Sequence, residues 1–243
     1  MLIKDYFDAI QTRIDAIRAD ESDKIAEVAR ICADSIAAGG VLHIHDTGHM
    51  LNTELSGRAG GLVGFTPFSY GINVASPNSY RMSKDPAPDL TAEIIALSLR
   101  KSTIRTGDVL FVGSVSGKSE GVVELALQAK AMGVTTVGVS SIAYSSALES
   151  QHPSGKRLFE VVDIALDNHA PYGDGMLEVE GLDAPVCPAS GLCAATIMWA
   201  VMAGTIENLL AKGIVPTVYK SVNAPGGPDD VNARQQRYKE LGY

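Results

Sequence analysis

Several features are scarce in this sequence of 243 residues, and each scarcity argues against a class of protein. The three cysteines, Cys32, Cys187 and Cys193, are an odd number without CxxC spacing, which argues against disulfides and a zinc site and favours reduced thiols in a cytoplasm. Basic residues are not clustered and the net charge is −8, so an extended phosphate backbone is not an expected partner. No helix-turn-helix segment is evident, and we therefore expect no nucleic-acid partner.

Long apolar runs are also lacking. The N-terminal residues MLIKDYFDAI contain acids and have no apolar signal core. The longest apolar run, residues 192–204, is too short to cross a bilayer and predicts a buried helix, so no membrane partner is expected. With 46% hydrophobic and 20% charged residues, the composition is that of a globular protein. We expect one domain over residues 1–243, with a helical segment at 1–38 and a C-terminal extension at 212–243.

The N-terminal segment predicts two helices. Over residues 3–19 the apolar positions recur at steps of three and four, which gives a helix with one apolar stripe. The stripe consists of Ile3, Tyr6, Phe7, Ile10, Ile14 and Ile17. A second helix begins at Ser22 and is stopped by Gly39 and Gly40. Little sequence near the first helix would bury its stripe, so we expect a partner subunit there, although docking on its own domain would also serve.

From residue 41 onward, short apolar strands alternate with helices. This alternation predicts a doubly wound α/β fold, in which helices cover both faces of a five-stranded parallel sheet. The strands are expected at residues 41–45, 61–68, 108–113, 135–141 and 163–168, with helices near 49–58, 91–102, 120–133 and 189–211 and a polar helix at the C-terminal end. Residues 171–185 are expected to be irregular. Ligands bind such sheets beyond the carboxyl ends of the strands.

One of the loops at those ends has the sequence GSVSGKSEG, residues 113–121, between a strand and a helix. Only three residues separate Gly113 from Gly117, so the loop is not a nucleotide P-loop, and GxGxxG does not occur at a strand end. The hydroxyls of Ser114, Ser116 and Ser119 and the backbone N–H groups converge at a helix N-terminus, which favours an anion such as a phosphoryl group. The alternative is an ordinary serine N-cap with a flexible turn.

The segment LFVGSVSGKSEGVVELALQAKAMGVTTVGVSS resembles the central part of sugar isomerase (SIS) domains, in which S-x-S-G-x-[ST] cradles a sugar phosphate. The likeness covers about residues 1–240 and is closest to a branch related to phosphoheptose isomerases, marked by RAGGL and HPSGKRL. It implies the doubly wound five-stranded sheet and a homo-oligomer, dimer or tetramer, with sites near subunit interfaces. On matching positions it implies that Gly48 and the serines of the loop bind the substrate, that Ser140 lines the pocket, and that Glu54 is a proton-transferring base.

Two departures from that family concern the site. Asp46 replaces the leading glycine of the first loop, and a carboxylate there would repel an anion unless a cation intervenes. The last core helix lacks the histidine of the phosphoheptose isomerases, so the sequence suggests His49 as the acid instead. No cofactor is expected. A divalent metal could be bound by His45, Asp46, His49 and Glu54. The favoured interpretation is structural: the strand histidines are hydrogen-bonded, Asp46 caps a helix, and Glu54 forms an ion pair with Arg58.

The leading hypothesis for function is an aldose–ketose isomerase acting on a sugar or sugar phosphate in the cytoplasm, with Glu54 as base and His49 as acid or oxygen donor. The alternatives are a non-catalytic sugar-phosphate-binding regulator that uses the same pocket, and lyase or epimerase chemistry with the same base. His152 and Lys156 of HPSGKRL either close over the pocket or belong to a solvated loop.

Overall fold

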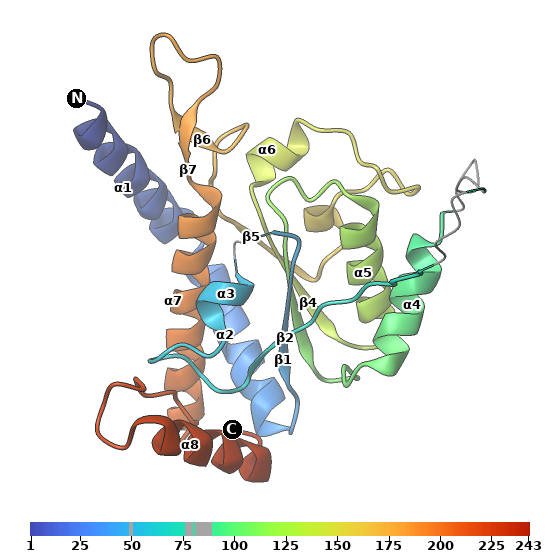
Figure 1. The fold of residues 1–243 in the computed structure, drawn as a ribbon, viewed down its shortest axis with the longest axis vertical. Coiled ribbons are helices and arrows are strands. Elements are labelled where there is room, and N and C mark those ends of the chain that lie inside the picture. Colours follow the sequence, from blue (N-terminus) through green and yellow to red (C-terminus); the bar gives the residue numbers. More distant parts are fainter. Residues whose placement is uncertain (49–50, 76–79, 81–88) are drawn as a thin grey trace.

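The computed structural model describes residues 1–48, 51–75, 80 and 89–243, and it has a central sheet with helices on both faces (Figure 1). The helices are α1 (Leu2–Asp20), α2 (Ser22–Ala37), α3 (Asn52–Leu55), α4 (Thr91–Lys101), α5 (Glu120–Ala131), α6 (Ile142–Ser146), the 3-10 turn η1 (Leu158–Glu160), α7 (Ser190–Ala211) and α8 (Gly227–Leu241). The strands are β1 (Leu42–Asp46), β2 (Phe65–Pro67), β3 (Val109–Gly113), β4 (Thr135–Ser140), β5 (Ile164–Asp167), β6 (Gly175–Leu177) and β7 (Val186–Pro188).

The main sheet has the strand order β2-β1-β3-β4-β5, and every neighbouring pair is parallel. This confirms the predicted doubly wound five-stranded sheet. The order reverses at β1, because β2 lies on one side of it and β3 on the other. In such a sheet the loops that leave neighbouring strands at this point go to opposite faces, and ligands bind between them. Here those loops are the one that leaves β1 at Thr47 and the serine loop, residues 113–119.

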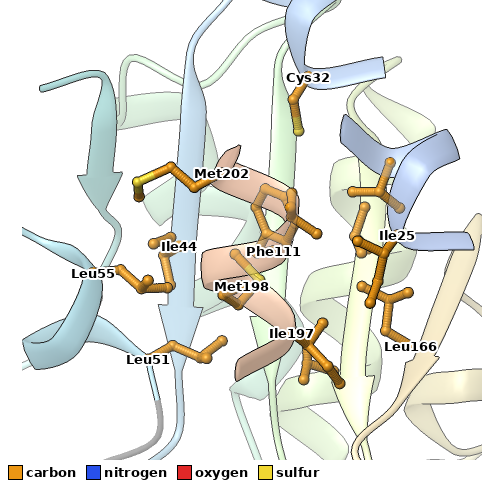
Figure 2. Close-up of a cluster of buried hydrophobic side chains, with 14 of the residues drawn as sticks. Ile25, Cys32, Ile44, Leu51, Leu55, Phe111, Leu166, Ile197, Met198 and Met202 are labelled. Carbon is orange, nitrogen blue, oxygen red and sulfur yellow. The ribbon is translucent and has the colours of Figure 1, made fainter. Parts of the chain in front are cut away.

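One face of the sheet is covered mainly by α2 and α7, with α1 and α3 beside them. Figure 2 shows Met198 and Met202 of α7 lying against the sheet side chains Ile44 and Phe111. By length and composition α7 could also cross a membrane, but here it packs as a core helix against α2, as the sequence predicts. The tight fit of α7 and α2 is visible at Gly204, where a Cβ would lie 2.8 Å from the Cβ of Ala29.

The opposite face is covered by α4 and α5. Leu110 and Val112 of β3 point into this second apolar cluster together with Ile95 of α4 and Leu125 of α5, and all four are buried. Because side chains alternate along a strand, the cluster on this face is separate from the one under α7. The serine loop connects β3 to α5 and therefore runs toward the α5 side.

The apolar stripe of α1 is buried only toward the end of the helix. Ile17 is 3% exposed, whereas Ile3 and Phe7 are 68% and 62% exposed. α1 packs on its own chain against β6, α7 and α2. Its first half projects from the body of the molecule (Figure 1).

Two expectations about regular structure were wrong. The strand expected over 61–68 is reduced to β2, because residues 60–63 pair instead with residues 217–219: the Val63 amide donates to Thr217 O at 3.0 Å, and Leu62 bridges Val218. Residues 171–185 were expected to be irregular, yet β6 begins there and pairs antiparallel with β7. Both pairings depend on partners that the local pattern does not identify.

Candidate functional site

The serine loop is fixed through its carbonyl groups. Each of three carbonyl oxygens accepts a hydrogen bond from the surrounding protein: Val115 O from the Ser141 amide at 3.0 Å, Gly117 O from the Leu158 amide at 2.8 Å, and Lys118 O from the Gln151 amide at 2.9 Å. In a trans peptide the carbonyl and the N–H of the next residue point in opposite directions. Because these three carbonyls point toward the surrounding protein, the N–H group of the residue after each of them points the opposite way.

Those N–H groups belong to Ser116, Lys118 and Ser119, and none of them donates a hydrogen bond to the residues that the structure describes. The next amides, of Glu120 and Gly121, are the first of α5 and have no partner within the helix. Unpaired donors at a helix N-terminus favour an anion, because the helix dipole adds partial positive charge there. The loop thus has the polarity that an anion cradle needs.

The serine side chains have different surroundings. The Ser114 hydroxyl is buried and accepts the Gly117 N–H at 3.3 Å, so it shapes the turn. Ser119 occupies the N-cap position of α5 with an extended backbone, but its side chain makes no capping hydrogen bond. Ser116 is half-buried. An ordinary serine N-cap requires the serine side chain to accept a hydrogen bond from a backbone N–H of the first helical turn, and Ser119 makes no such bond. The Ser119 hydroxyl can therefore bind a ligand.

Gly117 is the position of the loop that tolerates no side chain. Its φ is +55°, and a Cβ there would lie 3.0 Å from Leu158 Cβ and 3.3 Å from Ser145 Oγ. The Ser145 hydroxyl is fully buried and has no hydrogen-bond partner among the described residues, and the same holds for Ser140 at the end of β4. The sequence suggested Ser140 but not Ser145, since α6 brings Ser145 to the loop only through the fold.

The first loop follows β1, and Asp46 holds it. Its two carboxylate oxygens accept the N–H of Gly48 at 3.3 Å and that of Leu51 at 2.7 Å. The Thr47 amide donates to Gly113 O at 3.2 Å, which ties this loop to the start of the serine loop. Asp46 therefore binds the backbone that follows β1, but it is not the helix cap that the sequence suggested, because the N-cap position of α3 is Leu51 and has no side-chain capping bond. His49 lies outside the described residues.

Glu54 lies on α3, on the face of the sheet that α7 covers. Its carboxylate pairs with Arg58 one turn later and accepts the Trp199 Nε1–H at 3.3 Å. The side chain is 35% exposed and lines a pocket of about 480 Å³ with residues of α7, including Leu192 and Thr196. The lining of this pocket contains no residue of the serine loop. Trp199 is the only tryptophan of the sequence, but nothing local indicated that it meets Glu54.

The strand histidines are both hydrogen-bonded. His43 is buried, and its Nε2–H donates to Asp108 at 3.1 Å. Burial lowers the pKa of His43, with the Asp108 carboxylate opposing that effect. His45 donates from Nδ1 to Phe68 O at 3.1 Å and stacks on Tyr70, and burial lowers its pKa as well.

Two of the possible metal ligands, His45 and Glu54, lie on opposite faces of the sheet. His45 is in register with Val112, whose side chain faces α5, whereas Glu54 contacts α7 on the other side of the sheet. Among the residues that the structure describes, no group of three or more His, Cys, Asp or Glu side chains has the arrangement of a metal site.

Within the HPSGKRL segment, residues 153–156 are exposed, whereas His152 is directed toward α5. The His152 side chain is 9% exposed, and its Nε2–H donates to Glu124 of α5 at 2.8 Å. With Gln128 as the larger cause, this contact lowers the pKa of Glu124. The backbone carbonyl of Lys156 accepts a hydrogen bond from the Ser150 hydroxyl at 2.6 Å.

Comparison with known proteins identifies the family of this chain. The family model described as SIS domain matches residues 5–141, which include β1, the serine loop and β4. The chain belongs to the SIS domain family. A UPF0309 protein of Geobacillus sp. (strain WCH70) is 31% identical over 242 residues, covering 98% of this chain and 96% of the relative. A UPF0309 protein of Streptomyces griseus is 34% identical over 228 residues, covering 91% and 89%.

Two solved structures share the fold. The phosphoheptose isomerase from Francisella tularensis superimposes with a TM-score of 0.51 at 15% identity, over 84% of this chain and 96% of that one. E. coli CFT073 c3406, solved in complex with a sugar phosphate, gives 0.50 at 13% identity, over 88% and 91%. At such identities the likeness establishes the fold alone.

Proposed function

We propose that the protein binds a sugar phosphate through the serine loop and isomerises it between aldose and ketose. The observation that carries the proposal is that the N–H groups of Ser116, Lys118 and Ser119, next to the N-terminus of α5, have no partner among the described residues. A phosphoryl group has several acceptor oxygens and negative charge, which suit these donors and the serine hydroxyls. Membership of the SIS domain family and the neighbouring structure of c3406 with its bound sugar phosphate support this ligand class.

In the proposed reaction Glu54 is the base. It takes the proton from the hydroxyl-bearing carbon beside the carbonyl and returns it to the former carbonyl carbon. A donor gives a proton to the carbonyl oxygen, and the neighbouring hydroxyl loses its proton to become the new carbonyl. His49 is the proposed donor. Gly48, Gly117 and Ser140 complete the proposed binding surface. Neither a cofactor nor a metal ion has a part in this proposal.

The second candidate is a sugar-phosphate-binding protein without catalysis, and one observation favours it. Both carboxylate oxygens of Glu54 are engaged, one by Arg58 and one by Trp199. A side chain held in this way can serve as a structural ion pair. A substrate would have to displace one of these contacts to make the carboxylate a base.

The test combines binding with isotope exchange. The protein is titrated with a panel of aldose and ketose phosphates, and deuterium incorporation from the solvent at the carbon beside the carbonyl is followed by NMR. Binding with exchange supports the isomerase. Binding without exchange over the whole panel supports the second candidate, and absence of binding would contradict both.

We further propose that the protein acts in the cytoplasm as a dimer or tetramer. All three cysteines are unpaired, and burial raises the pKa of Cys32 to about 12 and that of Cys193 to about 11. The exposed apolar side chains of α1, such as Ile3 and Phe7, provide a surface for another subunit.

A further inference from the structure

Residues 147–158 run from the end of α6 to the first residue of η1, and they make the two hydrogen bonds that hold the centre of the serine loop. The Gln151 amide donates to Lys118 O at 2.9 Å and the Leu158 amide donates to Gly117 O at 2.8 Å. These bonds fix the two peptide planes that carry the N–H groups of Lys118 and Ser119. Figure 1 shows the segment after α6 passing over the N-terminal end of α5.

The segment is itself attached to α5 by His152, next to Gln151. The imidazole donates from Nε2 to the Glu124 carboxylate at 2.8 Å, and the Ser154 amide donates to Nδ1 at 3.1 Å. Because the first nitrogen is a donor and the second an acceptor, the ring has one tautomer and one orientation in its neutral form. Glu124 lies one turn into α5, so the bond connects the segment to the helix that begins at the serine loop.

The other end of the segment is attached by Arg157, next to Leu158. Its guanidinium donates to Ser146 O at 2.9 Å at the end of α6 and pairs with Glu160 at 2.8 Å. It also lies over the Phe159 ring, 5.0 Å from the centroid. Each of the two residues that bond to the serine loop is thus adjacent to an anchored side chain.

We propose that residues 147–158 hold the serine loop in its anion-binding form, with His152 as the positioning residue. His152 does not contact the ligand in this scheme. It keeps Gln151 against Lys118 O, so that the Ser119 N–H points to the anion before the anion arrives. Donors oriented in advance bind more tightly, because no ordering cost is paid on binding. The anion part of this inference rests on the proposed function, and the loop-holding part does not.

The experiment compares three substitutions of His152 in the full chain. Alanine removes both contacts, glutamine places an amide donor near the position of Nε2, and asparagine places one near Nδ1. The matched control is Lys130→Met, which removes a 2.8 Å ion pair between the far end of α5 and Asp163. Hydrogen exchange of the Gln151 and Leu158 amides is measured by NMR without ligand, and affinity is measured by titration with inorganic phosphate.

We expect His152→Ala to speed exchange at both amides and to weaken phosphate binding by about tenfold, the scale of one hydrogen bond to a charged group. We expect glutamine to restore both properties and asparagine to restore neither, since the contact to α5 uses Nε2. Lys130→Met should leave both unchanged.

Unchanged exchange at Gln151 and Leu158 in folded His152→Ala would overturn the inference, whatever the affinity. So would equal effects of His152→Ala and Lys130→Met, because the role would then be general stability. If the unsubstituted protein binds neither phosphate nor any sugar phosphate, the proposed function fails, and the exchange measurement still decides whether His152 holds the loop.

Discussion

Replacing Glu54 by glutamine separates a catalytic base from a structural ion pair, because the two roles predict losses of different size. Glutamine keeps the shape and the oxygen that accepts the Trp199 N–H at 3.3 Å, but it loses the charge that pairs with Arg58. The two partners of that pair are 52% and 35% exposed, so its loss should cost about 0.3–0.5 kcal/mol of the free energy of unfolding. For a chain of this length, that lowers Tm by about 1–2 °C.

Loss of a general base is a larger effect. It should slow solvent-proton exchange at the substrate carbon by about 10²–10⁴-fold, which corresponds to about 3–5 kcal/mol in the barrier. Affinity for the sugar phosphate should change little, since Glu54 is proposed to act on the carbon and not on the phosphoryl group. The assay is deuterium incorporation followed by NMR, with the fluorescence of Trp199 as a check that the local packing is intact.

Arg58→Gln is the matched control, because it removes the same ion pair and keeps the carboxylate. We expect the same small loss of stability and exchange within about threefold of the unsubstituted protein. Full exchange activity in Glu54→Gln would refute Glu54 as the base and leave His49 as the candidate. Equal loss in both variants would show that the ion pair, not the basicity, is what matters.

Three other predictions concern the loop, a buried histidine and the surface of α1. Alanine at Ser116 and Ser119 together should weaken a sugar-phosphate ligand by about 1–3 kcal/mol in a titration, and unchanged affinity with an intact fold would contradict the cradle. Because burial lowers the pKa of His43, the unfolded chain gains the proton first as the pH falls below about 6.5. The free energy of unfolding should therefore decrease toward the folded pKa by up to about 1.4 kcal/mol per pH unit, and His43→Gln should flatten this urea-unfolding profile. Light scattering at micromolar concentration should give an oligomer that Phe7→Asp weakens, and a folded wild-type monomer would be evidence against the partner subunit.

Much of the fold was predictable because its signals are local. The inward positions of α2, including Ile25 and Val28, follow from helical spacing and are buried in the structure. The serine loop was recognisable because small polar residues stand between an apolar strand and an amphipathic helix. The parallel direction of the strands follows from the alternation of strand and helix, since each helix carries the chain back to the end of the sheet at which the previous strand began.

The same kind of signal failed where partners are distant in the chain. Residues 60–63 have the pattern of a strand but pair with residues 217–219. Asp46 looked like a charge beside an anion, yet its carboxylate is used by the amides of Gly48 and Leu51. A sequence shows which groups can form hydrogen bonds, whereas the choice of partner depends on which backbone groups the packing brings within reach.

For the candidate site, the sequence by itself determined the residue types: serines, a glycine and the start of a helix. Tertiary structure alone decided the polarity of the loop, because the amides of Ser141, Gln151 and Leu158 take its carbonyls and leave three of its N–H groups without a partner among the described residues. It also decided that Glu54 meets Trp199, 145 positions later in the chain. The physical reason is the same in both cases: peptide planes and carboxylates are oriented by the groups that pack against them, and those groups come from distant parts of the chain.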